Sequence, residues 1–331
     1  MLQVGKISLA TVLVVGTLAI DYIGSYPGSF QVLREADKLN ISLSLDQLEP
    51  SYGGCAINIA VGLRKLAHQV LPFALTGQKL DPRYREHLTT IGVSLDGLIS
   101  LPDFRLSSQC FIVTDVDGNQ FTSFYPGPSR SDRYYDLLDQ FVEQHAHAID
   151  CAVLAPDIGI NMASAVAVCQ QYDLPFLSDP GQCLNDFTDA ETQYLVDQSS
   201  VLCVNRHEFE LLQNRVSNFD SIPVLVRTMG EAGVEVIQAS KSQQITAVEP
   251  ERTVDPTGCG DAFRAGLVHG RLLGYPWADA CKVATTLASI AIEHHGTQTY
   301  SIDQLESRIQ RHWGLEIQSN PLNYSDVFVA D

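Results

Sequence analysis

The feature that most constrains the fold is a set of short apolar segments at near-constant spacing in the second half of the chain. Segments 151–154, 175–177, 201–204 and 223–226 begin 22 to 26 residues apart. Each interval leaves room for one helix, so the pattern predicts β-α units and a mostly parallel sheet. Ligands bind beyond the carboxyl ends of the strands in such sheets.

Polar residues that follow apolar runs are therefore candidates for a binding site. The candidates are Asp21, Asp157, Asp179, Asn205 and Thr228. The run before Asp21 has two interpretations, because Lys6 followed by apolar residues 7–20 is also the pattern of a secretion signal. The β-branched segment 12–15, which ends at Gly16, favours a buried first strand. No other run approaches the length of a membrane span, so no membrane partner is predicted.

Composition and charge restrict the partners further. The chain has 331 residues, of which 45% are hydrophobic, enough for a large core. Its 21 Lys and Arg against 39 Asp and Glu give 21 − 39 = −18. A nucleic-acid partner is not expected, because phosphate binding needs clustered cations. A small anionic substrate would need a local device, such as backbone N–H groups or Mg²⁺.

The cysteines indicate the compartment. There are eight, and none forms a C-x-x-C pair. In a chain of this length we interpret them as reduced, mostly buried thiols, which predicts a cytoplasmic protein. The histidines lack zinc-ligand spacing.

Two stretches in the first half predict local structure. Gly53 and Gly54 form a turn into a helix over 54–67. Strand-forming residues at 110–114 and 120–125 flank the turn sequence at 117–119, which predicts a hairpin able to cover a cleft.

The most informative stretch is Asp255-Pro256-Thr257-Gly258-Cys259-Gly260-Asp261, which precedes small and apolar residues at helical spacing. It predicts a glycine-bordered turn whose backbone N–H groups converge on an anion at a helix start. Asp261 is placed to accept the proton of an attacking hydroxyl. The alternative is ordinary capping by an acidic residue. The stretch is not a Walker A loop, because no Gly-Lys-Ser/Thr follows.

Four motifs in order resemble the ribokinase-like (PfkB) family of sugar and nucleoside kinases. They are the 255–261 stretch, Gly53-Gly54 with Asn58, Asn205-Arg206-His207-Glu208, and Thr228-Met229-Gly230-Glu231-Ala232-Gly233. The resemblance implies a ribokinase-like three-layer α/β sandwich with a mostly parallel central sheet and a small β lid. It places the kinase domain at 1–315, lid segments at about 20–50 and 100–126, and a C-terminal tail at 316–331.

Within the family, the chain resembles bacterial adenosine and nucleoside kinases. The residues that carry this likeness are 179–182, 124–127 and Gly296-Thr297-Gln298. The resemblance implies ATP-dependent phosphorylation of a ribose 5′-hydroxyl, with adenosine as the expected substrate, by a monomer or homodimer. A ribose or fructose kinase and a catalytically silent nucleoside-binding protein remain the alternatives.

The resemblance also implies roles for single residues around the reacting groups. Asp261 matches the catalytic base, and the backbone of Gly258, Cys259 and Gly260 matches the anion hole, with Cys259 in place of the usual Ala. Asp21 matches the carboxylate that binds two sugar hydroxyls. The residues that would approach the same ribose are Gly53, Gly54 and Asn58. Each of these also has a plain structural interpretation as a cap, a turn or a tolerated polar residue.

The remaining roles concern the base and the nucleotide. Phe124 matches an aromatic residue that stacks on the nucleoside base, and Phe111 is a second candidate whose alternative is core packing. Asn205 and Glu208 resemble a pair that positions Mg²⁺ through water, or alternatively an ordinary helix start. Thr228, Gly230 and Gly233 would border ATP. A monovalent cation such as K⁺ binds in some relatives, but no residue is assigned to it here.

Overall fold

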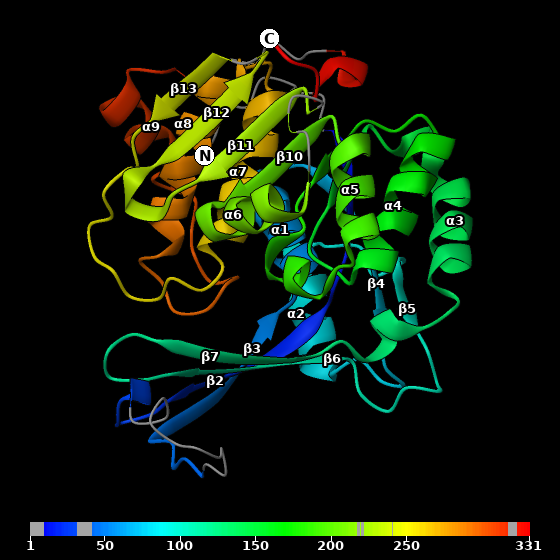
Figure 1. Cartoon of the computed structure of the whole chain (residues 1–331), viewed down its shortest axis with the longest axis vertical. Coiled ribbons are helices and arrows are strands. Elements are labelled where there is room, and N and C mark those ends of the chain that lie inside the picture. The colour runs from blue at the N-terminus through cyan, green and yellow to red at the C-terminus, as the bar shows by residue number, and fades with distance from the viewer. Residues whose placement is uncertain (1–9, 32–41, 217–218, 220–221, 240, 317–322) are drawn as a thin grey trace.

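A nine-stranded sheet forms the centre of the computed structural model, which describes residues 10–31, 42–216, 219, 222–239, 241–316 and 323–331 (Figure 1). The strand order is β13-β12-β11-β10-β9-β8-β1-β4-β5. In chain order the strands are β1 (Thr11–Val15), β4 (Gln69–Thr76), β5 (Leu98–Ser100), β8 (Cys151–Leu154), β9 (Phe176–Ser178), β10 (Val201–Asn205), β11 (Val224–Thr228), β12 (Val234–Gln238) and β13 (Lys241–Ile245).

The predicted mostly parallel sheet is confirmed. Every neighbouring pair from β5 to β11 is parallel, and only β12 runs against the others. The four evenly spaced apolar segments are β8, β9, β10 and β11, which lie side by side. They read as continuous apolar runs because helices cover both of their faces.

Helices cover the sheet in two layers, so the domain has three. One layer contains α1 (Cys55–Lys65), α2 (Pro82–Ile91), α7 (Cys259–Leu272), α8 (Trp277–Ala291) and α9 (Leu305–Trp313). The other contains α3 (Tyr134–His145), α4 (Gly159–Gln171), α5 (Asp189–Gln198) and α6 (Arg206–Arg215). Short 3₁₀ helices lie at Gly127–Arg130, Ala146–Ala148, Gly181–Asp186, Gly230–Ala232 and Tyr324–Asp326.

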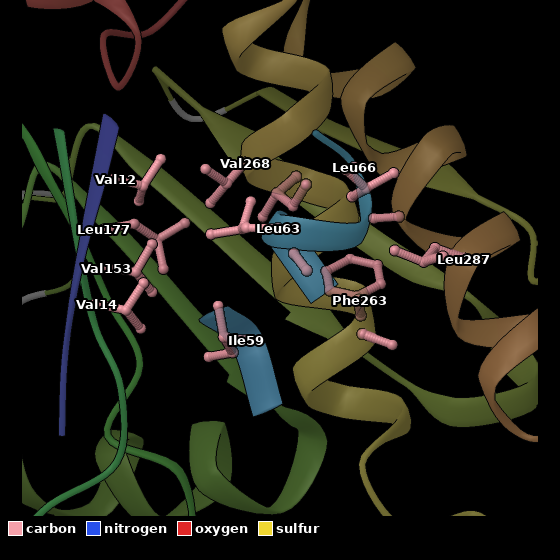
Figure 2. Close-up of a cluster of buried hydrophobic side chains, with 14 of the residues drawn as sticks. Val12, Val14, Ile59, Leu63, Leu66, Val153, Leu177, Phe263, Val268 and Leu287 are labelled. Atoms are coloured by element: carbon pink, nitrogen blue, oxygen red, sulfur yellow. The ribbon is translucent and has the colours of Figure 1, made fainter. Parts of the chain in front are cut away.

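Successive side chains of β1 point alternately to the two faces of the sheet, so the strand contributes to the core on both sides. Val12 and Val14 belong to the apolar cluster with α1 and α7, whereas Leu13 and Val15 belong to the cluster with α3 and α4. Figure 2 shows the first cluster, where Val12 and Val14 lie near Ile59 and Leu63.

Small residues bring α1, α7 and α8 close together. A methyl group added to Gly62 of α1 would lie 2.7 Å from the Cβ of Ala265, and one on Gly266 of α7 would lie 2.8 Å from the Cα of Ala284. Larger side chains would therefore separate the helices. The α1–α7 contact matters for the site, since the two helices begin near each other.

A second, four-stranded sheet lies below the main body in Figure 1. It has the order β3 (Gln47–Gly53), β2 (Ala19–Ser25), β6 (Ser108–Thr114) and β7 (Gln120–Tyr125). The predicted hairpin is β6–β7, and Asp115 accepts hydrogen bonds from the backbone N–H groups of Asp117 and Asn119 at its tip. Of the predicted lid segment 20–50, residues 32–41 lie outside the described part of the chain.

The C-terminal segment is packed against the body. Of the tail predicted at 316–331, residues 317–322 lie outside the described residues, and 323–331 dock on α7 and α8 with Val327 and Phe328 buried. Arg271 donates to the carbonyl oxygens of Val327 at 2.9 Å and Val329 at 3.1 Å, and pairs with Asp331. The docked part is thus held by a buried guanidinium rather than loose.

All eight cysteines lie in the described part of the chain and are free thiols, and five of them are buried. No helix among the described residues is both long and apolar enough to cross a membrane.

We expect Arg271→Ala to lower the free energy of unfolding by about 2–4 kcal/mol, because it leaves the buried Val327 oxygen without its donor and breaks the ion pair with Asp331. It also removes the guanidinium that lies over the Trp277 ring. Urea denaturation measures the change. Arg311→Ala, on the exposed side of α9, is the matched control. Equal stability of the two variants would contradict the role of Arg271.

Candidate active site

The start of α7 is a glycine-bordered backbone turn. Its N-cap residue, Gly258, has a φ of 78° and an added Cβ would lie 2.8 Å from Thr297, so only glycine fits without strain. Among the described residues no side chain caps the helix. The preceding turn is held by Asp255, which accepts from the N–H groups of Thr257 (2.9 Å) and Gly296 (3.0 Å). The Cys259 N–H already donates to the Pro256 oxygen at 3.2 Å, whereas the other N–H groups of the first turn and the helix dipole favour an anion here.

Asp261 lies in the first turn of α7, beside those N–H groups. Asn58 of α1 donates from Nδ2 to Oδ2 of Asp261 at 2.8 Å, which links the two helix starts. Burial raises the pKa of Asp261 to about 6, against the opposing effects of the Asn58 hydrogen bond and the Arg264 charge. A carboxylate with such a pKa can take up a proton near neutral pH.

Asp21 forms the opposite wall of the site. The sequence pattern placed it after the first strand, whereas the structure places it within β2, in the second sheet. Burial, together with the smaller effect of the Asp261 charge, raises the pKa of Asp21 to about 7. The two carboxylates thus belong to one electrostatic site.

The glycine pair before α1 makes room for Asp21. A Cβ on Gly53 would lie 2.0 Å from the Asp21 carboxylate, and Gly54 adopts a φ of 92° with Thr17 oxygen 2.4 Å from its added Cβ. A side chain at Gly53 would displace the Asp21 carboxylate, and one at Gly54 would require the backbone to move. The predicted turn therefore has a steric reason at both residues.

A buried ion pair lies behind the α7 start, and the sequence analysis did not select its cation. Arg264 of α7 contacts Asp179 at the end of β9, with Nε 2.7 Å from Oδ2 and Nη2 3.1 Å from Oδ1. Nη1 of the same guanidinium lies 2.8 Å from an added Cβ on Gly260. The sequence did contain a signal for this pair, because Arg264 is a charged residue in a predicted helix of small and apolar residues. A buried arginine needs an acidic partner.

Asn205 and Glu208 form a capping box at the start of α6. Asn205 Oδ1 accepts from the N–H of Glu208 at 2.9 Å, and Glu208 Oε2 accepts from the N–H of Asn205 at 2.7 Å. Burial and the nearby Asp179 raise the pKa of Glu208, and Arg264 opposes them. The N-x-x-E motif thus has a structural role, whatever else it does.

The described residues do not enclose a bare metal ion. No group of three or more His, Cys, Asp or Glu side chains is placed to hold one within the described ranges. Both oxygens of Glu208 already accept hydrogen bonds from Asn205. This donor set fits Mg²⁺ that keeps its water and is held mainly by phosphate oxygens.

Thr228 ends β11 next to Asn205, its register partner on β10. In the following turn the N–H of Met229 donates to the Gly233 oxygen at 2.8 Å, and Gly230 has a φ of 60° with open space around it. Gly233 instead packs against β13, because an added Cβ would lie 2.1 Å from the Ile245 oxygen. Only Gly230 leaves room for an approaching molecule.

The register of the second sheet separates the two predicted aromatic contacts. Asp21 pairs with Cys110, and Cys110 pairs with Phe124, so these three side chains lie on one face. Phe124 is 37% exposed there. Phe111 lies on the other face, where it stacks on Tyr22 with ring centroids 5.1 Å apart. This position does not fit the substrate contact predicted for Phe111.

Asp157, a candidate from the end of β8, is not joined to this site. Its carboxylate accepts from the N–H of Ile158 at 2.8 Å, and burial raises its pKa to about 7. No hydrogen bond or ion pair in the described part of the chain links it to Asp261.

Comparison with known proteins gives related chains of the same length. A nucleoside kinase of Methanothermobacter thermautotrophicus is 28% identical over 313 residues, which is 92% of this chain and 97% of the relative. The structure of Burkholderia thailandensis nucleoside kinase in complex with inosine has a TM-score of 0.81 and 31% identity, and covers 93% of this chain and 99% of that one. A Thermotoga maritima ribokinase, 17% identical with a TM-score of 0.73 over 91% of this chain and 99% of that one, shows the shared fold alone.

The two sheets and the site at the α7 start therefore define a ribokinase-like α/β fold, as predicted. The model of the pfkB family carbohydrate kinases matches residues 9–305, and the chain belongs to that family. It is thus a phosphotransferase whose acceptor is an alcohol group.

Asp21→Asn should stabilise the protein in alkaline solution. The pKa of Asp21 is raised from 3.8 to about 7 in the folded state, so folding binds a proton more tightly and the free energy of unfolding falls as pH rises between these values. Asparagine avoids this cost, which gives a gain on the order of 2–4 kcal/mol at pH 8 that vanishes near pH 4.

Urea denaturation of the wild type and the variant across this pH range measures the gain. Asp103→Asn, an exposed position before β6, is the control. A gain that does not change with pH would show that Asp21 ionisation is not its cause.

Proposed function

We propose that this protein is a nucleoside kinase that transfers the γ-phosphate of ATP to a ribose 5′-hydroxyl, with adenosine as the first substrate to test. The observation that carries the proposal is the meeting of Asp21, Asp261 and the open α7 start in one site. Phe124 on the Asp21 face supports a nucleoside over a free sugar. Two of the relatives named above are nucleoside kinases, and the structure of one of them is in complex with inosine.

The acceptor would be held between the second sheet and the two helix starts. The Asp21 carboxylate can accept from both hydroxyls of a vicinal diol, and Gly53 and Gly54 let the backbone approach the ribose. Asn58, held against Asp261, lies next to the same position. Phe124 would stack on the base.

The donor would lie along the carboxyl edge of the main sheet. Backbone N–H groups of Gly258, Cys259 and Gly260 would bind the γ-phosphate, with Arg264 as a buried positive charge behind them. Thr228 and Gly230 would border the nucleotide, with Gly233 shaping their turn. Asn205 and Glu208 would hold Mg²⁺ through its water. When bound, the ion would screen charge on the phosphates. A structure of the Burkholderia protein contains ADP and inosine, which supports an adenine nucleotide as donor.

Asp261 would act as the general base. It lies at the α7 start, so a 5′-hydroxyl beside it faces a phosphate bound on the N–H groups. The carboxylate would accept the hydroxyl proton as the oxygen attacks in line, while the helix start stabilises negative charge on the transferred group. The second sheet would exclude water as a lid over the nucleoside. We place the kinase domain at 1–315, supported by the family match over 9–305.

A substrate panel tests the proposal. We expect ATP- and Mg²⁺-dependent release of ADP with adenosine or inosine, and much slower release with ribose, fructose and fructose phosphate. Chromatography identifies the nucleoside 5′-monophosphate. Asp261→Asn should lower kcat by about a thousandfold or more with little change in nucleoside binding.

Three results would contradict the proposal. Faster turnover of ribose or fructose would make the protein a sugar kinase. Nucleoside binding without turnover in the wild type would favour a silent binding protein, and a normal kcat in Asp261→Asn would remove the assigned base.

Phe124 and Phe111 give a matched pair for base recognition. Phe124→Ala should raise the nucleoside KM about tenfold, because one stacking contact is worth about 1–1.5 kcal/mol, and should leave any residual ribose turnover unchanged. Phe111→Ala truncates the same residue type on the other face of the hairpin. Equal effects of the two variants on nucleoside KM would contradict stacking by Phe124.

A further inference from the structure

A chain of buried polar side chains lies behind Asn58 and connects the glycine turn to Asp261. Tyr84 of α2 donates from its hydroxyl to the Gly53 oxygen at 2.8 Å. Gln298 donates from Nε2 to the Tyr84 hydroxyl at 2.9 Å and to Asn58 Oδ1 at 2.8 Å. Asn58 in turn donates from Nδ2 to Asp261.

The direction of every hydrogen bond in this chain follows from its first member. A backbone carbonyl can only accept, so the single Tyr84 proton goes to Gly53 and the hydroxyl must accept from Gln298. The Gln298 group that faces Tyr84 is therefore its amide nitrogen. The same nitrogen faces Asn58, so Asn58 turns its oxygen toward Gln298 and its nitrogen toward Asp261.

The other neighbours of these amides do not fix this direction. Thr297 lies 2.8 Å from Asn58 Oδ1 and 2.9 Å from the Tyr52 oxygen, but its hydroxyl has one proton for both. The His87 ring lies 2.9 Å from Gln298 Oε1 and can present either a protonated or a bare nitrogen. Gln298 and Tyr84 therefore determine which end of the Asn58 amide, the oxygen or the nitrogen, faces Asp261.

We infer that Gln298 is a positioning residue, which with Tyr84 fixes the Asn58 amide so that only a donor faces Asp261. A donor stabilises the carboxylate more strongly than the protonated acid, so it favours the ionised form of the base. The inference rests on the proposed function only in naming Asp261 the base.

Several charged and titratable groups surround Asp261, and substitution of Gln298 leaves most of them unchanged. They are Asp21 from β2, Cys55 from α1, Tyr84 from α2, Asp179 after β9, Cys259 and Arg264 from α7, and Tyr300. The Asn58 hydrogen bond lowers the pKa of Asp261 against the effect of burial. Loss of the fixed donor should therefore move the Asp261 titration upward.

The test is a direct titration of Asp261 in the full chain without substrates. Carboxyl-¹³C-labelled aspartate is followed by NMR against pH, and the Asp261 signal is the one missing from Asp261→Asn. Gln298→Met removes the donor at similar volume, and we expect the midpoint to rise by about one pH unit. Gln298→Glu replaces the donor by an acceptor and should raise it further. Tyr84→Phe frees Gln298 to turn and should raise it less.

His87→Phe is the matched control, because it removes a contact to the same glutamine and keeps a ring against Tyr52. We expect its midpoint to equal that of the wild type. An unmoved midpoint in the folded Gln298 and Tyr84 variants, or an equal rise in His87→Phe, would overturn the inference. Should one variant fail to fold, the others still give the result.

Profiles of kcat against pH give a second readout, in which the acid limb should move with the NMR midpoint. A uniform loss of kcat without movement of the limb would indicate a merely structural role and overturn the inference. The NMR result needs no substrate. If the wild type phosphorylates no nucleoside, the proposed function is refuted. The NMR titration still decides whether Gln298 positions Asn58 against Asp261.

Discussion

The structure depends on two neighbouring carboxylates, the buried Asp21 and the half-buried Asp261. Asp21 comes from β2 of the second sheet and Asp261 from α7, and burial raises the pKa of both toward neutrality. Such an arrangement opposes folding, because desolvated like charges repel. It is sustained by the core around α1 and α7, where Gly62 and Ala265 permit close contact between the helices. Stability supplied by the apolar core thus compensates for strain at the site.

In the proposed function, backbone dipoles would let a molecule with an overall charge of −18 bind phosphate groups. The α7 start offers N–H groups, and Arg264 contributes one buried cation that Asp179 keeps in place. A backbone site of this kind does not need the clustered surface cations that nucleic-acid binding requires. The acidic surface and the anion site are therefore compatible.

Sequence patterns predicted the features that depend on residues close together in the chain. The apolar segments gave the parallel sheet, and the glycines at 53, 54 and 258 marked backbone positions that no side chain can occupy. Contacts between distant segments were not predictable, because pairs such as Arg264–Asp179 and Gln298–Asn58 join residues far apart in the sequence. The face occupied by Phe111 depends on strand register, and the docking of 323–331 depends on a buried arginine in α7.

The row Asp21–Cys110–Phe124 has a geometric consequence. Directly paired residues on adjacent strands are separated by a fixed spacing of about 4.8 Å, so two steps set the backbone distance from residue 21 to residue 124 at roughly 10 Å. If residue 21 binds the sugar and residue 124 contacts the base, this fixed distance would select for the length of the bound molecule. A molecule too short to contact both residues would bind more weakly.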